Sequence, residues 1–269
     1  MRFVEKYAGA ISGSLMTSAI VGGLVLVAGF ACGKSASDQP SAVTNNKGLE
    51  QKTQDTPVMM GGSGGTVSGT VKFDGTPPAP KKITPDKDQS ACAHEIVSDS
   101  LLVDADSKGI KWAFVEVVNS GNFADDGKTS YALDQKGCTF LPHILVVPPK
   151  AAVELHNSDG VLHNVKSSSM LNSAFNEGIP ANSKVSKKFM MPEKIKVSCD
   201  VHSWMGAYII VTKNAGFAVT DEKGNFEIKG VPVGKYKIKV WHETLGTQEK
   251  DIEVKDNEKT DASFQLKEK

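Results

Sequence analysis

The sequence predicts an all-β protein, and two observations support this class. From Thr66 onward, short runs of alternating apolar and polar residues recur between Gly, Pro, Asn and Asp, and no helical period persists over a dozen residues. In the run 235–241, lysines alternate with Tyr236, Ile238 and Val240, so one face of the strand is apolar and the other is charged. Half-buried strands of this kind are typical of a β-sandwich.

Each expected strand is an alternating or apolar run bounded by turn residues. We expect strands at 67–73, 112–118, 144–147, 153–156, 161–165, 194–199, 207–211, 217–220, 226–228, 236–241 and 252–254.

The charge balance narrows the class of partner. Lys and Arg together number 31, as do Asp and Glu, so no basic excess is available to neutralise a phosphate backbone. We therefore expect no nucleic-acid partner.

The N-terminal region has the pattern of an export signal. Residues 7–33 carry no charge and follow Arg2 and Lys6. The residues before Cys32 resemble a bacterial lipoprotein cleavage site, although Gly29 stands where Leu is usual. Lipidation at Cys32, cleavage after Ala31, and an uncleaved span, which requires about 20 apolar residues, all remain open. Each places the rest of the chain outside the cytoplasm, in the periplasm or at the cell surface, and the lipid or the span would anchor it to a membrane.

Residues 33–65 are rich in Ser, Asn, Gln, Asp and Gly and contain few residues able to form a core. Such a composition cannot bury enough apolar area to offset chain entropy. We expect a flexible linker.

A candidate metal-binding set surrounds Cys199. Ile195, Val197 and Cys199 share one strand face by the two-residue period, so the sulfur points inward. His202 and Met205 follow in a C-x2-H-x2-M loop, and His163 offers a second imidazole 36 residues before the cysteine. Thiolate, imidazole and thioether are the ligand types that copper selects.

The segment from about Ser130 to Thr212 resembles a blue-copper domain of the plastocyanin or amicyanin type, a Greek-key β-sandwich of the cupredoxin class. The resemblance lies in Phe140-Leu141-Pro142 before the run 144–147, in the first-ligand segment 154–165, and in the short final loop.

The resemblance implies one type 1 copper held by His163, Cys199, His202 and Met205, with Asn164 bracing the loop that bears Cys199. It also implies that His202 lies at the surface edge as the electron exit, beside an apolar docking patch. The implied partner is another redox protein, such as a c-type cytochrome or a copper enzyme.

Two further cysteines, Cys92 and Cys138, leave two alternatives open. In an oxidising compartment they are expected to form a disulfide. With His94 and His143 they would alternatively offer a tetrahedral, zinc-like ligand set. We expect His156 and His242 to be structural.

The flanking segments resemble the transthyretin-like carboxypeptidase regulatory domain, a small β-sandwich. The resemblance covers 217–228 and 230–241, and the family's opening strands resemble 65–71 and 114–118, which precede the copper segment. Insertion and tandem arrangements both remain open. The expected division is an anchor at 1–32, a linker at 33–65, the first part of the regulatory-like sandwich at 66–129, the cupredoxin at 130–213 and the second part at 214–269.

The leading hypothesis is an electron carrier of the bacterial cell envelope that is not an enzyme. Copper storage or delivery is the first rival, although Met-rich and Cys-rich tracts are missing from the sequence. An oxidoreductase would need a second metal with open coordination, for which His94, His143 and His156 are the available ligands. A structural sandwich that binds an envelope partner is the last alternative.

Overall fold

The computed structural model describes residues 64–92, 95–123 and 131–268, and in these ranges all regular structure is β-strand. The predicted all-β class is confirmed. No helix in the described ranges is long and apolar enough to cross a membrane. The expected signal, Cys32 and all but the last two linker residues lie outside the described residues. Those two, Gly64 and Gly65, already belong to the first strand.

Two sheets are built from strands at both ends of the described chain. The first contains β1 (Gly64–Phe73), which pairs antiparallel with β15 (Asn225–Pro232) and parallel with β18 (Lys259–Asp261) and β19 (Phe264–Leu266). The second has the order β14 (Phe217–Val219), β4 (Phe114–Val117), β16 (Gly234–His242) and β17 (Gly246–Val254).

Two more sheets are built from the intervening residues. One has the order β10 (Asn176–Ile179), β9 (His163–Ser168), β12 (Glu193–Ser198), β13 (Gly206–Val211) and β7 (Ile144–Val147). The other has the order β11 (Ser183–Lys188), β8 (Ala152–Asn157), β5 (Tyr131–Lys136) and β6 (Thr139–Leu141). The pairs β13–β7 and β5–β8 are parallel, and the remaining pairs are antiparallel.

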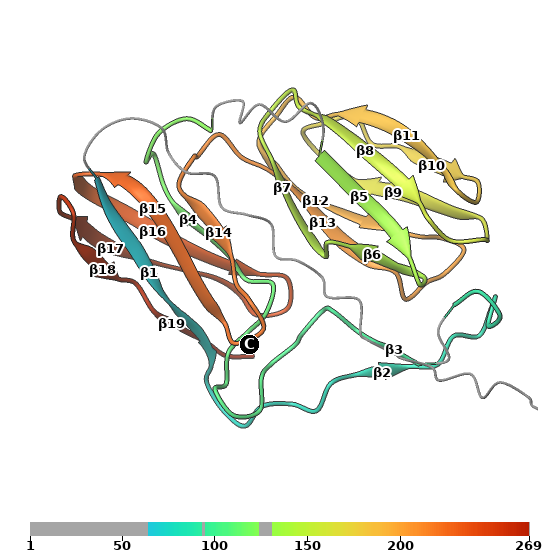
Figure 1. Ribbon diagram of the computed structural model, residues 1–269, viewed down its shortest axis with the longest axis horizontal. Coiled ribbons are helices and arrows are strands. Elements are labelled where there is room, and N and C mark those ends of the chain that lie inside the picture. The colour runs from blue at the N-terminus through green and yellow to red at the C-terminus, as the bar shows by residue number, and fades with distance from the viewer. Residues whose placement is uncertain (1–63, 93–94, 124–130, 269) are drawn as a thin grey trace, which may run out of the picture. The chain divides into compact units, whose positions relative to one another are not determined.

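The two pairs of sheets are nested in the sequence. β4 and β14 hydrogen-bond to each other in one sheet, although all strands from β5 to β13 lie between them in the chain. The colour ramp of Figure 1 shows this, because blue β1 lies beside orange β15 and green β4 beside orange β14, while the yellow-green, yellow and light orange strands β5 to β13 form their own sheets. The sheet pairing is therefore that of an insertion.

Alternation along β12 shows how the sequence directs side chains inward. Ile195 and Val197 are fully buried, whereas Lys194 and Lys196, which precede them in turn, are exposed. Each buried aliphatic side chain contributes about 1.5–3 kcal/mol through removal of apolar surface from water. Cys199 continues the buried face with 3% of its surface exposed, so the strand that builds the core also directs the thiol inward.

The residues between β1 and β4 form a long connection with little regular structure. Among its described residues, a small ladder joins β2 (Lys82–Ile83) to β3 (Ile96–Val97). This connection carries Asp88 and Cys92, both of which reach the site described next.

Candidate metal centre

Three of the four predicted ligands lie at the ends of two neighbouring strands or in the loop that follows one of them. β9 and β12 are antiparallel and hydrogen-bonded, so the start of β9 lies at the same end of the sheet as the end of β12. His163 is the first residue of β9, Cys199 directly follows β12, and His202 lies in the loop before β13. The fold thus brings together residues that are far apart in the chain.

The donor atoms of these residues form a compact triangle. His163 Nδ1 and His202 Nδ1 are 2.8 Å apart, and each lies 4.0 Å from Cys199 Sγ. A point in this plane about 2.0 Å from both nitrogens lies about 2.3 Å from the sulfur, and these are the lengths of metal–imidazole and metal–thiolate bonds. All three side chains are buried, with 0 to 3% of their surface exposed. The donor set and its spacing fit one metal ion.

Asn164 joins the two ligand-bearing segments. Its Oδ1 accepts hydrogen bonds from the backbone N–H groups of Asp200, at 2.7 Å, and Val201, at 3.3 Å, and from the Cys199 thiol at 3.3 Å. Its Nδ2 donates to Asn176 Oδ1 at 2.6 Å. The side chain therefore fixes the loop that bears Cys199 against β9.

The ligand loop is also closed on itself. Cys199 N–H donates to the carbonyl of Met205 at 3.3 Å, and Met205 N–H donates to the carbonyl of His202 at 3.0 Å. Met205 is 2% exposed and packs in the same buried cluster as Cys199. Its thioether as a fourth, weak ligand stays a prediction.

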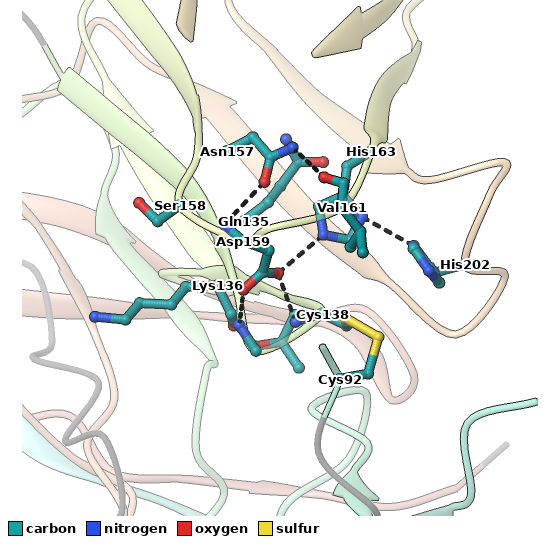
Figure 2. Close-up of polar contacts among 12 residues, drawn as sticks. Cys92, Gln135, Lys136, Cys138, Asn157, Ser158, Asp159, Val161, His163 and His202 are labelled. Carbon is teal, nitrogen blue, oxygen red and sulfur yellow. Dashed lines mark hydrogen bonds and ion pairs between the residues drawn. A yellow bond between two sulfur atoms is a disulfide. The ribbon is translucent and has the colours of Figure 1, made fainter. Parts of the chain in front are cut away.

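Carboxylates hold the outer nitrogens of both imidazoles. His163 Nε2 lies 2.9 Å from Asp159 Oδ2, and His202 Nε2 lies 2.8 Å from Asp88 Oδ2. Figure 2 shows Asp159 between the ring of His163 and the backbone of Cys138. A carboxylate on the outer nitrogen fixes the ring orientation and makes the inner nitrogen a stronger metal ligand.

Asp159 is itself held by the turn between β5 and β6. Its carboxylate accepts from the N–H groups of Gly137 at 2.7 Å and Cys138 at 2.9 Å. Figure 2 shows the contact with Cys138. Sequence reasoning missed Asp159, although its position four residues before His163 in a polar turn was a usable signal. Asp88 had no such signal, because it lies 114 residues from His202.

The electrostatics of the pocket favour a thiolate and an imidazolium. Burial by itself lowers the pKa of His163, but the hydrogen bonds that its ring donates to Asp159 and Cys199 outweigh it and raise that pKa to about 9. Burial raises the pKa of the Cys199 thiol, yet the hydrogen bonds that its sulfur accepts from His163 and from nearby backbone N–H groups bring this pKa below its ordinary value. An incoming metal would displace a proton from the imidazolium, so its affinity falls with falling pH.

The predicted disulfide is confirmed. Cys92 and Cys138 are bonded with an S–S distance of 2.00 Å, which excludes their use as two thiolates of a zinc-like site. His143, a proposed member of that site, instead contacts Glu243 and lies 3.1 Å from the carbonyl of Gly206. His94 lies outside the described residues.

The expectation that His202 lies at the surface edge is wrong. Its side chain is fully buried, and the carboxylate of Asp88 lies 2.8 Å from the outer nitrogen. The resemblance that led to the expectation covers about residues 130–212, so Asp88 lies outside it.

The two remaining described histidines lie apart from the triangle. His156 is half-buried and lies 2.9 Å from Glu154 Oε2. His242 is buried, which lowers its pKa to about 4, and its Nε2 has no hydrogen-bond partner within the described ranges. Neither joins a compact metal-type cluster of the described residues.

Comparison with protein families matches residues 201–269 to the CarboxypepD_reg-like domain. This match covers less than half of the chain. It begins inside the ligand loop and includes β13, although β13 pairs only with β12 and β7 among the described strands. None of the curated proteins compared with the chain matches it.

Several solved structures with copper in their names are similar to part of the chain. A Cu-containing nitrite reductase from Thermus scotoductus SA-01 is 19% identical over 31% of this chain and 22% of its own, with a TM-score of 0.30. A purple cupredoxin from Nitrosopumilus maritimus is 19% identical over 31% of this chain and all of its own, with a TM-score of 0.28. An amicyanin mutant in its reduced Cu(I) form is 16% identical over 36% of this chain and 98% of its own, with a TM-score of 0.30. This chain thus spans about a fifth of the nitrite reductase, and TM-scores this low assign neither fold nor metal.

Proposed function

We propose that this protein binds one copper ion in a type 1 site and carries single electrons in the bacterial cell envelope. The observation that carries the proposal is the triangle of His163 Nδ1, His202 Nδ1 and Cys199 Sγ, whose spacing accepts one ion at ordinary bond lengths. Two imidazoles and one thiolate in a plane, with a weak thioether, are the ligand set of blue-copper electron carriers.

The surroundings of the ligands support electron transfer over other copper chemistry. When bound, copper would supply a one-electron couple. The chain supplies two rings held at their outer nitrogens and a cysteine loop fixed by Asn164, so the ligands resist rearrangement when the charge changes. Burial of all three ligands keeps water and substrates from the metal, as suits a carrier and not an enzyme.

An exported, anchored location is part of the proposal. The uncharged stretch 7–33 supports it, and so does the disulfide, because such bonds persist in oxidising compartments. The proposed partner is a redox protein, such as a c-type cytochrome or a copper enzyme.

The test is addition of one equivalent of Cu(II) to the purified chain, followed by visible and electron paramagnetic resonance spectra. We expect an intense thiolate-to-copper charge-transfer band that Cys199→Ser abolishes, and a reversible one-electron couple in voltammetry. The serine keeps the size and polarity of the side chain, so loss of the band reports the sulfur itself. A colourless protein that binds two or more copper ions would instead support storage or delivery.

A further inference from the structure

The imidazole edge through which a blue-copper site would meet a partner is closed in this protein. His202 is fully buried, and Asp88 occupies its outer nitrogen at 2.8 Å. We call residues 85–92 the strap. The carbonyl of Asp88 accepts from the N–H groups of Ala91 and Cys92, both at 2.8 Å, and Cys92 is tied to Cys138. The strap is therefore fastened next to the copper ligand.

Trp204 continues the path from His202 toward solvent. The two ring centroids are 5.0 Å apart with the planes tilted by 55°. In the described part of the chain, the only other ring contact of His202 is with His163. Trp204 Nε1 donates to the carbonyl of Cys138 at 3.0 Å, which fixes the indole, and the ring is half-buried with its free surface in a cleft.

This cleft, which we call the Trp204 cleft, has a volume of about 670 Å³. Trp204 and Met205 of the ligand loop form one part of its lining, Lys81 and Val97 come from the β2–β3 region, and Lys196 comes from β12. Val97 is 42% exposed and is one of the large apolar side chains left on the surface. The cleft therefore combines an aromatic ring beside the metal ligands with apolar and cationic walls.

Lysines outnumber acids in the lining of the Trp204 cleft, with Lys81, Lys82 and Lys196 against Asp99 and Glu243. The carboxylate of Asp99 accepts from Trp112 Nε1 at 3.1 Å and keeps its charge, and Glu243 contacts His143. A third lining lysine, Lys82, pairs with Glu95 outside the cleft. Lys81 and Lys196 are exposed, and within the described ranges neither ammonium group has a partner.

Resting on the proposed function, we infer that electrons leave through Trp204 instead of the His202 edge, and that the Trp204 cleft docks an electron-transfer protein with an acidic docking face. One electron passes from the reduced site to the acceptor's cofactor, and no bond or proton changes place. Lysines around an apolar centre steer an acidic partner over long range, while the aromatic contact shortens the distance that the electron must cross.

The first test needs no copper. Hexacyanochromate(III), an inert paramagnetic trianion, is added to the metal-free chain at low salt, and nuclear magnetic resonance signals are followed. We expect the Trp204 indole and the amides around Lys196 to broaden first. Lys196→Glu is expected to weaken this broadening about tenfold. Lys259→Glu, which changes an exposed strand lysine on β18, serves as the matched control and is expected to leave it unchanged.

The second test measures the rate at which ferricyanide oxidises the reduced copper-loaded chain. Trp204→Leu is expected to slow oxidation at every salt concentration, Trp204→Phe to retain most of the rate, and Lys196→Glu to slow it only at low salt.

Failure of this inference is distinguishable from failure of the proposed function. If the visible copper band forms but Trp204→Leu leaves the rate unchanged, or broadening centres away from the cleft, the inference is overturned and the copper site stands. If no visible band forms in the unaltered chain, the proposed function itself fails.

Discussion

Removal of the disulfide is the perturbation whose cost the structure specifies best. Cys92 and Cys138 are 46 residues apart in the chain, and their bond joins the long β1–β4 connection to the β5–β6 turn. For a closed loop of that length, loss of the cross-link stabilises the unfolded chain by about 4 kcal/mol. Both sulfurs are buried, so alanine replacements leave only small cavities in addition.

The assay is urea unfolding of the double variant Cys92→Ala, Cys138→Ala, followed by tryptophan fluorescence. We expect the free energy of unfolding to fall by about 4 kcal/mol, with an m-value that rises because the unfolded chain becomes more extended. The unaltered chain unfolded in excess dithiothreitol is the control, and it is expected to match the double variant. Cys199 remains present in both samples, so its thiol does not contribute to the difference.

The same variant tests whether the strap depends on the bond. The carbonyl of Asp88 accepts a hydrogen bond from the N–H of Cys92, so Asp88 is held close to the disulfide. Loss of the disulfide is therefore expected to free the strap and expose the ring of His202. Hydrogen exchange at the His202 amide and quenching of Trp204 fluorescence report this opening. If the double variant loses less than about 1 kcal/mol of unfolding free energy and the His202 amide exchanges no faster than in the unaltered chain, the disulfide does not hold the β1–β4 connection in place.

Three further predictions concern individual side chains. The buried His242 has a pKa of about 4 in the folded state and about 6.5 in the unfolded chain, so the unfolded chain binds more protons between these pH values. The free energy of unfolding should therefore fall by roughly 3 kcal/mol as the pH drops from 7 to 4. Urea titrations of His242→Gln should lack this part of the loss. Asn164→Ala should cost about 1–3 kcal/mol of unfolding free energy and speed loss of bound metal to a chelator, whereas Asn164→Asp keeps the acceptor and should retain more of the stability. Asp159→Ala should release the ring of His163 and weaken metal affinity about 10- to 100-fold in competition titrations, and an unchanged affinity would contradict the positioning role of this carboxylate.

The all-β class followed from alternation, but several strands gave no usable pattern. β11 reads Ser-Lys-Val-Ser-Lys-Lys, and none of its residues is buried. It is a strand because β8 supplies six paired residues, which is a tertiary fact. The short strands β6 and β10 are likewise held by pairing partners more than by local propensity, whereas the missed β5 does alternate, with Tyr131 and Leu133 buried.

Within the candidate site, spacing and residue type pointed to Cys199 and His202 together, whereas His163 was assigned with them through the resemblance to blue-copper domains. Cys199 and His202 are three residues apart in one loop, so their proximity is local. Asp88 is a different case, because only the folded connection and its disulfide carry it to His202. The expected exposure of His202 was wrong for this reason.

The most direct test of the central claim is copper K-edge X-ray absorption on the chain loaded with one equivalent of Cu(II). For the proposed site we expect one short sulfur scatterer at about 2.2–2.3 Å from copper and two imidazole nitrogens at about 2.0 Å, with the sulfur absent in Cys199→Ser. A first coordination shell of oxygen and nitrogen alone in the unaltered chain would contradict it.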